Sequence, residues 1–419
     1  MRSTRIPLSQ PSPPKLSNAL AGLRAIEESN LFSNFGPVNT RFEQTMACAM
    51  FGGVGECLTV CNATTGLILA IREAIKVPSA AGCRYALMPS FTFAAAAQAA
   101  LWNGLTPLFC DINPADWSAD PSAELQLLDR YRDEIAVIVP YATFGYDIDL
   151  AWYETLQQAY GIPVVVDAAA SLGTLSTDGQ GFGTGFSGAV VYSMHATKSF
   201  STGEGGLIYS GDAARIRRLR TMSNFGFGEP RNATTMGLNG KMSEIAALLA
   251  CLRFESLHEV MERRSRLVAL YRASLPELTF QAAKNNRQAH QFTSALLPAH
   301  LAAGRAGIQG AMQRAGVDSA NYFSPHVAQQ DLFAAGAAMA SLPVTDDIAS
   351  RVITLPLFDS MSEGQVHEVC AAVKSSLALT ERRLAKLAAS KAASKRATNK
   401  GQLPVASPAT LHFGGLGAV

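Results

Sequence analysis

One lysine stands in a sequence setting that suits covalent chemistry. Lys198 lies in SMHATKSFSTGEGG, residues 193–206, after an apolar run and before three glycines around Glu204. A lysine amine condenses with an aldehyde only when a shaped pocket holds the two together, and strand ends of open α/β sheets form such pockets. A single loop lysine is far more often a solvated surface charge, so Lys198 alone does not establish a reaction.

An aspartate at the end of a second apolar run would complete the same site. Asp167 follows four apolar residues in PVVVDAAASLGT, which predicts a buried or nearly buried carboxylate. Such a carboxylate is costly without a positive partner. A protonated pyridine nitrogen would be one, and the pairing would strengthen the ring as an electron sink. A strand-end aspartate that caps the next helix is an equally good interpretation.

A candidate phosphate site lies in CNATTGLILAI, residues 61–71. Asn62, Ala63 and Thr64 precede a run with helical apolar spacing, so the amides of Ala63 and Thr64 would point at a bound anion. Ser193 would add a hydroxyl. Because polar residues before a helix are also its commonest ordinary caps, both interpretations stay open.

The elements that must position these residues form an alternating pattern. From about residue 57 to 210, short apolar runs alternate with helix-like segments, which predicts a mainly parallel sheet wrapped by helices. The near-absence of polar residues in several runs is typical of strands that are covered on both faces. Predicted strands cover residues 85–88, 106–111, 135–140, 163–167, 189–194 and 207–210, and predicted helices include 66–76, 93–103 and 149–160.

The C-terminal half predicts a second domain. A long helical pattern at residues 243–274 is expected to bridge to it, and residues 279–377 mix a strand-like run at 294–297 with helices, as in a small α+β domain. The Ala/Lys-rich tail is expected to be helical at first and then disordered. The predicted division is an N-terminal arm (1–30), a large domain (31–242), a linking helix with the small domain (243–380) and the tail (381–419).

Composition indicates the compartment and the kind of partner. The 419 residues carry a net charge of +2, which offers no electrostatic reason to expect nucleic acid or an anionic membrane as partner. Neither a signal peptide nor a bilayer-spanning apolar stretch is apparent. Seven cysteines without a Cys-x-x-Cys pair favour a reduced, cytoplasmic protein and no metal site. Cys57 and Cys61 would share a helix face if that segment were helical, but packing is their more common role.

In order along the chain, these segments resemble the DegT/DnrJ/EryC1/StrS sugar aminotransferases of fold type I. The resemblance covers residues 30–377 and runs through SNFGP, CNATTGLILAI, MPSFTFAAAAQAA, PLFCDI, VVVDAAASLG, SMHATKSFSTGEGG, SNFGF, GLNGKMSE and PVTDDIASRVITLPLF. It implies an α/β enzyme that depends on pyridoxal 5′-phosphate. The family fold has a large domain with a mainly parallel seven-stranded sheet wrapped by helices, and a smaller α+β C-terminal domain.

The resemblance also implies roles by motif position. Lys198 matches the family's Schiff-base lysine, and Asp167 matches the partner of the pyridine nitrogen. Phe93 falls where relatives place an aromatic ring over the cofactor. The phosphate-binding positions are Ala63, Thr64 and Ser193.

Asn239 aligns with an asparagine that reaches the phosphate of the neighbouring subunit in relatives. This implies a homodimer with an active site shared across the interface. Some positions depart from the pattern: Ala170, near the cofactor ring, stands where many relatives have Gln or His, and Gly240 and Lys241 stand where they often have Tyr-Arg. These departures weaken any transfer of substrate preference.

Candidate substrate-binding residues are His195, Lys241 and His326. His195 lies three residues before Lys198, where a packed histidine is at least as common. His326, in NYFSPH, resembles a stretch of some sugar aminotransferases in which the small domain faces the substrate, although a structural role is slightly favoured.

The implied reaction transfers an amino group, with L-glutamate as the expected donor, to a nucleotide-linked keto sugar. Because both substrates must use one site in turn, we expect an open cleft. The alternatives are a cyclitol or other cyclic ketone as acceptor, or a non-catalytic regulator with the same fold. Lys198 and Asp167 argue against a regulator, since neither is needed for folding alone. Lys198 also argues against the related sugar dehydratases, which have histidine there.

Overall fold

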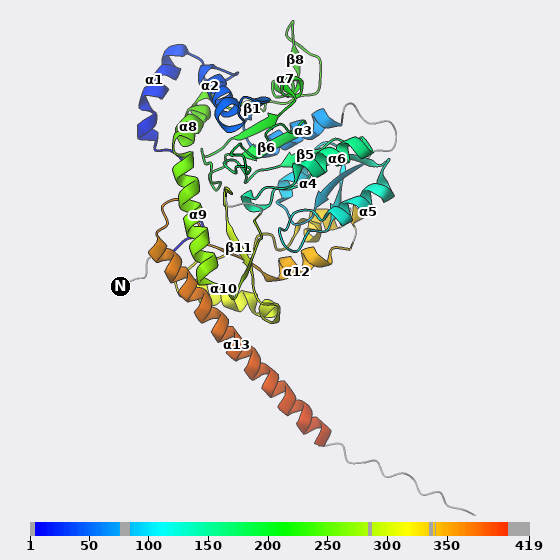
Figure 1. Ribbon diagram of the computed structural model, residues 1–419, viewed down its shortest axis with the longest axis vertical. Helices are drawn as coiled ribbons and strands as arrows, with labels where there is room; N and C mark the ends of the chain where they lie inside the picture. Colours follow the sequence, from blue (N-terminus) through cyan, green and yellow to red (C-terminus); the bar gives the residue numbers. More distant parts are fainter. Residues whose placement is uncertain (1–4, 76–83, 284–286, 335–337, 340, 401–419) are drawn as a thin grey trace, which may run out of the picture.

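A central mixed sheet organises the larger part of the molecule (Figure 1). The computed structural model describes residues 5–75, 84–283, 287–334, 338–339 and 341–400, and in 338–339 and 391–400 the backbone alone. The strands of this sheet are β1 (Glu56–Val60), β2 (Tyr85–Pro89), β3 (Thr106–Cys110), β4 (Ile135–Ile138), β5 (Val165–Asp167), β6 (Ala189–Ser193), β7 (Gly206–Ser210) and β12 (Ala338–Met339).

The strand order confirms the predicted sheet. Two groups of strands, β1-β7-β6-β5 and β12-β3-β2-β4, meet because Ile138 and Tyr141 form parallel bridges with Val164 and Asp167. Strand β7 runs antiparallel to both β1 and β6, whereas the other pairs are parallel. Within the described residues the sheet therefore has the expected seven strands, mainly parallel, plus the two-residue edge strand β12.

The predicted strands all form, and β1 is an addition. Cys57 lies on β1, so the alternative in which Cys57 and Cys61 share a helix face is wrong. The six cysteines that fall within the described residues are free thiols, and Cys83 lies outside those residues. Cys57 is buried in the sheet, and its predicted packing role is thus confirmed.

Helices cover both faces of the sheet, as the apolar strands require. Successive strand residues point to opposite faces: Val165 packs with the cluster that holds α3, α4 and α7, and Val166 with the cluster that holds α2, α5 and α6. The predicted helices at 93–103 and 149–160 are confirmed, and α3 begins three residues before the prediction; Lys76 lies outside the described residues. These helices are α2 (Pro37–Thr45), α3 (Ala63–Ala74), α4 (Ala94–Trp102), α5 (Pro121–Tyr131), α6 (Leu150–Tyr160) and α7 (Ala213–Met222).

The long helical pattern at 243–274 forms two helices instead of one. Helix α8 (Glu244–Glu255) ends at Ser256, and α9 (Leu257–Ser274) begins directly after it. Ser256 leaves the helical conformation, and its hydroxyl donates to the carbonyl of Arg253 (3.1 Å). The N-terminal helix α1 (Leu20–Ser29) packs against α8, where a Cβ on Gly22 would lie 2.5 Å from Leu248.

A smaller α+β unit follows. Its antiparallel sheet is ordered β10-β11-β13, and β11 confirms the strand expected at 294–297. Helices α9, α10 and α13 share its apolar core with Ile6 of the N-terminal arm. The remaining elements are β10 (Thr279–Phe280), β11 (Thr293–Leu296), β13 (Val352–Leu355), α10 (Arg305–Arg314), α11 (Asp331–Ala334), α12 (Pro343–Arg351), α13 (Glu363–Lys400) and the hairpin β8 (Phe227–Gly228) and β9 (Asn232–Ala233).

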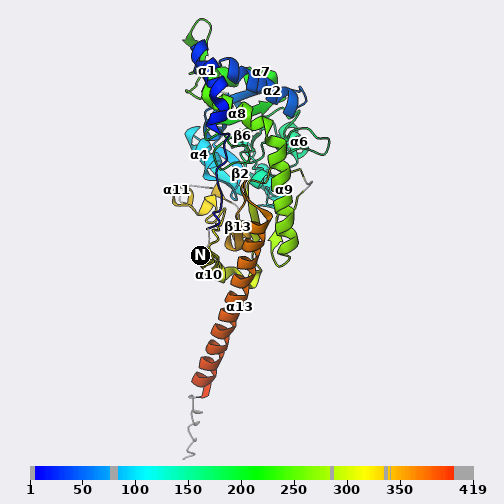
Figure 2. The same cartoon turned by 90° about the vertical axis from the view of Figure 1, so that its left-hand side faces the viewer.

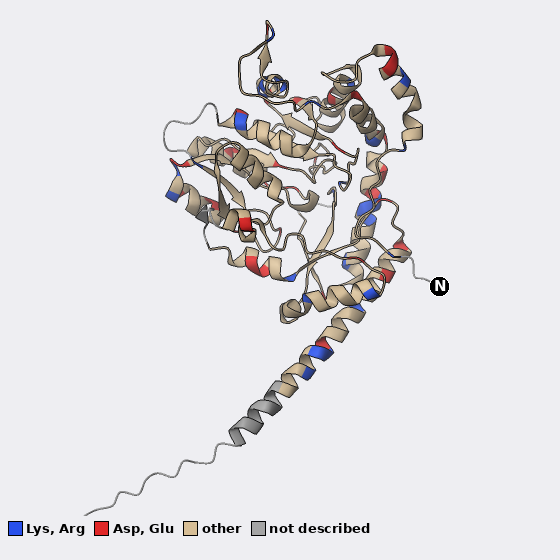
Figure 3. Cartoon of the chain, turned by 180° about the vertical axis from the view of Figure 1, so that it is seen from behind, with Lys and Arg blue, Asp and Glu red and all other residues tan. Residues whose placement is uncertain are grey.

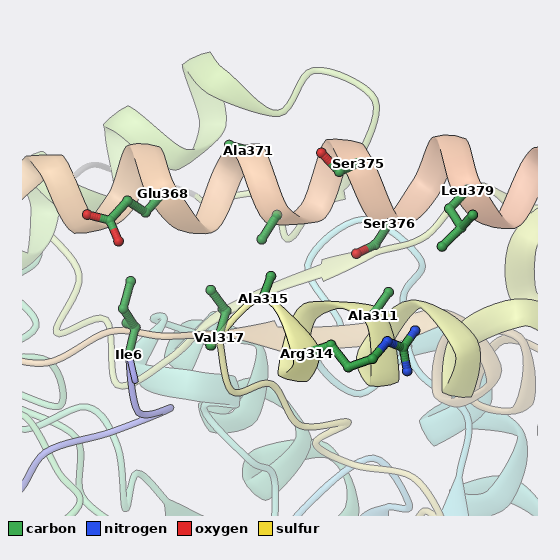
Figure 4. A pocket seen from close by; sticks show the side chains of 12 residues that line it. Ile6, Ala311, Arg314, Ala315, Val317, Glu368, Ala371, Ser375, Ser376 and Leu379 are labelled. Carbon is green, nitrogen blue, oxygen red and sulfur yellow. The ribbon is translucent and has the colours of Figure 1, made fainter. Parts of the chain in front are cut away.

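Helix α13 is the most extended feature of the molecule. A groove of about 510 Å³ separates its first half from α10, with Ile6 at one end and Arg314 on the α10 side (Figure 4). The second half projects beyond the body (Figures 1 and 2). Arg382, Arg383 and Lys386 are exposed on this helix, and Figure 3 shows basic residues in blue along it. In the described part of the chain, no helix combines the length and apolar character needed to cross a bilayer.

The boundaries of the arm, the two domains and the tail that the sequence predicts stay a prediction.

Candidate active site

Lys198 lies in the loop that joins β6 to its antiparallel neighbour β7. Its N–H donates to the carbonyl of His195 (2.8 Å), and Phe200, two residues later, is fully buried and contacts Phe42. These contacts anchor the loop in the core on one side. The side chain of Lys198 itself is only half-buried.

The amine of Lys198 is held among polar groups at low exposure to water. Its Nζ donates to Oε1 of Gln291 at 3.0 Å. Burial lowers the pKa of Lys198 to about 8, and the carboxylate of Asp167 opposes that shift. An amine with this pKa exists in both protonation states near neutral pH, as proton transfer requires.

Asp167 ends β5 and is only 1% exposed. Its Oδ1 accepts the N–H of Ala169 (3.0 Å), and the residues that follow form turns, so the interpretation as a helix cap is wrong. Burial raises the pKa of Asp167 to about 6, while the Ala169 hydrogen bond and Lys198 act to lower it. A carboxylate buried in this way is favoured by a cationic partner.

The start of α3 forms a site suited to an anion. Asn62 caps the helix by accepting the N–H of Thr65 (2.8 Å), and within the described residues no protein acceptor meets the N–H groups of Ala63 and Thr64. Ser193 lies beside them, because its register partner Gly206 contacts the start of α3: a Cβ on Gly206 would lie 2.9 Å from the nitrogen of Ala63. The three predicted phosphate-binding residues are thus brought together.

These residues fit pyridoxal 5′-phosphate. The buried carboxylate of Asp167 suits a protonated ring nitrogen, the low-pKa amine of Lys198 suits an aldehyde, and the start of α3 suits a phosphate. Phe93 immediately precedes α4 and is 61% exposed, with its ring 6.5 Å from that of Phe323. Ala170 is buried and offers no polar side chain.

His195 is engaged within its own loop. Its Nδ1 is 2.9 Å from Oγ1 of Thr197, and its Nε2 is 3.7 Å from a carboxylate oxygen of Glu204. His195 stays a candidate substrate contact, since its side chain is 45% exposed.

Asn239 and Lys241 form a separate cluster. Lys241 Nζ donates to Oδ1 of both Asn224 and Asn239 at 2.8 Å, and it lies 4.9 Å from the ring centre of Phe225. Contacts between this cluster and Lys198 are not seen within the described residues. Their roles at a partner's phosphate and at the substrate stay predictions.

His326 is buried and lies between Ser90 and Asp346. It is 2% exposed, its Nδ1 is 2.7 Å from Oγ of Ser90, and its Nε2 is 3.0 Å from Oδ1 of Asp346. With the ring proton on Nε2, Nε2–H donates to the carboxylate of Asp346 and Nδ1 accepts the hydroxyl hydrogen of Ser90, whose oxygen also accepts the N–H of Ala328. Both ring nitrogens are therefore used in joining β2 to α12, and neither is available to a substrate here.

Gln291 is the site residue that the sequence interpretation missed. It lies just before β11, 93 residues from Lys198, in a segment whose pattern indicates a strand and nothing about chemistry. Only the fold brings the two together.

The fold and this site define a fold type I aminotransferase that depends on pyridoxal phosphate. A family model described as the DegT/DnrJ/EryC1/StrS aminotransferase family matches residues 16–374. The chain belongs to that family. Transaminases named among its relatives support an enzyme over the alternative of a non-catalytic regulator with the same fold.

The chain is similar to several relatives and solved structures. Protein Rv3402c of Mycobacterium tuberculosis is 33% identical over 88% of this chain and 90% of its own. The dTDP-4-amino-4,6-dideoxy-D-glucose transaminase of Escherichia coli is 26% identical over 87% and 96%. A Bacillus cereus crystal structure, assigned as a PLP-dependent aminotransferase, superposes with a TM-score of 0.83 at 36% identity and covers 88% of this chain and 100% of its own. The structure of DesI with its TDP-sugar product has a TM-score of 0.78 at 28% identity, over 91% and 96%.

Proposed function

We propose that this aminotransferase moves an amino group from L-glutamate to a keto sugar carried on a nucleotide. The observation that carries the amino-transfer chemistry is the placement of Lys198, in the loop after β6, near the buried carboxylate of Asp167 at the end of the neighbouring strand β5. Support for the acceptor comes from relatives. The Escherichia coli transaminase is named for a dTDP-sugar, and an Acidithiobacillus ferrooxidans relative, 28% identical over 78% of this chain and 86% of its own, is named for a UDP-sugar.

Each site residue has a distinct task in this reaction. Bound pyridoxal 5′-phosphate would supply the aldehyde and the electron-accepting ring. Asp167 holds a proton at the ring nitrogen, because its buried carboxylate gains from a cationic partner. The amides of Ala63 and Thr64 and the hydroxyl of Ser193 bind the phosphate. Lys198, once its amine is free, would accept a proton from the donor carbon and deliver it to a carbon of the bound cofactor.

The half-buried state of Lys198 supports an open approach for a bulky acceptor. Asp167 is closed off from water, whereas Lys198 keeps part of its side chain exposed. This exposure is in keeping with the proposed alternation of glutamate and a sugar nucleotide at one site.

The proposed homodimer is supported by exposed apolar side chains near the Asn239 cluster. Phe225, Met236 and Ile245, on segments close to Asn239 in the chain, are between 44% and 63% exposed, and a partner subunit would cover them in the proposed dimer. In the proposed dimer, Asn239 reaches the phosphate of the partner subunit's site.

The test is an acceptor screen with the purified full chain, pyridoxal phosphate and L-glutamate, in which 2-oxoglutarate is measured. Keto sugars on dTDP and UDP form one arm, and cyclitol ketones without a nucleotide form the other. Formation of 2-oxoglutarate with nucleotide sugars alone is the expected result. Turnover with the cyclitols alone would contradict the sugar proposal and leave the aminotransferase chemistry intact.

A further inference from the structure

The amine of Lys198 has its hydrogen-bond partner in a different part of the fold. Lys198 belongs to the β6–β7 loop, whereas Gln291 lies on the segment that enters the small sheet at β11. Gln291 is 4% exposed, and its Oε1 accepts from Nζ at 3.0 Å. A buried amide pointed at a reactive amine calls for an explanation beyond packing.

The backbone of Gln291 is fixed on both sides. Its N–H donates to the carbonyl of Phe144 (3.0 Å), and Nη1 of Arg264 donates to the carbonyls of Gln291 (3.4 Å) and His290 (3.0 Å). His290 has a φ of +42° and Phe144 a φ of +59°, in the left-handed region that is costly for side chains other than glycine. The surrounding structure thus holds Gln291 in place against local backbone preference.

The same network also fixes the loop of Lys198. Asp359 accepts from Nε of Arg264 (2.8 Å) and from Nη2 of Arg253 (2.7 Å). Nε of Arg253 in turn donates to the carbonyl of Ser199 (3.1 Å), the residue after Lys198. One carboxylate, 11% exposed, therefore ties together the two segments that bring the amine and the amide into contact.

Asp167 is the carboxylate that raises the pKa of the Lys198 amine, because the other ionisable groups near this contact are paired with each other or uncharged. Arg253 and Arg264 are paired with Asp359. His290 is neutral, because burial and the nearby Arg272 and Arg264 lower its pKa to about 3. Tyr141, beside Asp167, stays protonated, since burial raises its pKa.

We propose that Gln291 is a positioning residue that holds the free amine of Lys198 in the site and, being uncharged, does so without trapping it as an ammonium ion. A carboxylate at this position would give the same hydrogen bond but would favour the charged form. The amide therefore combines a fixed position with a proton that is readily released. This inference rests on the aminotransferase chemistry of the family and is independent of the acceptor.

The test is a titration of Lys198 in the full chain after removal of cofactor. Lysine amines are methylated with ¹³C-formaldehyde and a cyanoborohydride reductant, and the Lys198 resonance is identified by its absence in Lys198→Ala. Gln291→Glu is expected to raise the titration midpoint by about one pH unit or more. The matched control is Gln157→Glu on α6. The side-chain oxygen of Gln157 accepts the N–H of Val164, and a glutamate carboxylate would accept it as well. This control variant should leave the titration midpoint of Lys198 unchanged.

A second variant removes the acceptor without adding charge. Gln291→Met keeps the side-chain length, and it is expected to slow capture of pyridoxal 5′-phosphate by the stripped chain by about tenfold, because the amine loses its orientation. Circular dichroism and thermal melting establish that both variants fold. An unchanged midpoint in Gln291→Glu, or an unchanged capture rate in Gln291→Met, would overturn the proposal.

Discussion

Among single residues, Asp167 and Lys198 are each held away from their ordinary charge state. Burial raises the pKa of Asp167 to about 6 and lowers that of Lys198 to about 8. When the site contains no cofactor, the charged form of each residue lowers the stability of the folded chain, since it is poorly hydrated there. The stripped chain should therefore show a pH dependence that is traceable to these two groups.

For Asp167, the direction in which stability changes with pH follows from the number of protons that the folded and unfolded chains bind. Between its ordinary pKa of 3.8 and the raised value of about 6, the folded chain binds more protons than the unfolded chain, so stability falls as pH rises through this window. At pH 7, Asp167→Asn is expected to raise the free energy of unfolding of the stripped chain by on the order of 3 kcal/mol. Urea unfolding at pH 4 and pH 7 measures it. A gain that is equal at both pH values would contradict this assignment.

Lys198→Ala is the direct test of the covalent role. The variant should still bind pyridoxal phosphate through Asp167 and α3, but without a covalent link, and it should lose transamination by at least about a thousandfold. Visible absorption before and after borohydride treatment reports the link. Normal turnover in this variant would refute the assigned role of Lys198.

Glycine at position 206 lets two elements approach closely. A Cβ there would lie 2.9 Å from both the nitrogen of Ala63 and Cγ2 of Val60, so Gly206→Ala should displace the start of α3. We expect this variant to lose affinity for pyridoxal phosphate more than for pyridoxal, which has no phosphate. Gly307→Ala in α10 is the control, because nothing lies within 4 Å of its Cβ. Equal losses for both ligands would contradict a phosphate site at α3.

Asp111 joins the large sheet to the small unit by capping α12. Its carboxylate accepts the N–H groups of Val344 (3.0 Å) and Thr345 (2.8 Å) and the hydroxyl of Thr345 (2.7 Å). Asp111→Ala should lower the free energy of unfolding by about 1–2 kcal/mol, as measured in urea. Asp111→Asn keeps one acceptor oxygen and should lose less. An effect no larger than in Asp120→Ala, which removes the cap of α5 within the large unit, would show that Asp111 adds nothing by joining the two units.

The sequence predicts elements with strong local patterns and misses those that depend on distant contacts. Strand β1 has the mixed pattern ECLTV, and β12 has only two residues, so neither stands out. The break at Ser256 carries no Gly or Pro. Lys198, Asp167 and the start of α3 are identifiable because each follows a strand or begins a helix, whereas Gln291 becomes relevant only through a contact 93 residues away.

Across the whole molecule, charge is divided between the body and the end of α13. Residues 381–400 contain seven basic residues and one acidic residue, so the rest of the chain has a net charge of −4. Deleting residues 386–419 removes five basic residues and changes the net charge from +2 to −3. Because residues 386–390, the part of this stretch whose side chains the structure describes, are exposed, we expect an unchanged melting temperature and loss of retention on a cation exchanger. A clear fall in melting temperature would show that the projecting segment packs against the protein.

The antiparallel placement of β7 beside β6 has a consequence for how far the reactive amine can travel. Strands that run in opposite directions can be joined by one loop on the same edge. Lys198 lies in such a loop, residues 194–205, in which the N–H of Ala196 donates to the carbonyl of Gly203 (2.8 Å) and the N–H of Thr202 to the carbonyl of Met194 (2.9 Å). These hydrogen bonds restrain the backbone at Lys198. Rotation about the bonds of its four methylene groups must then carry the nitrogen between reacting carbons, and proton delivery is confined to an arc drawn around one restrained Cα.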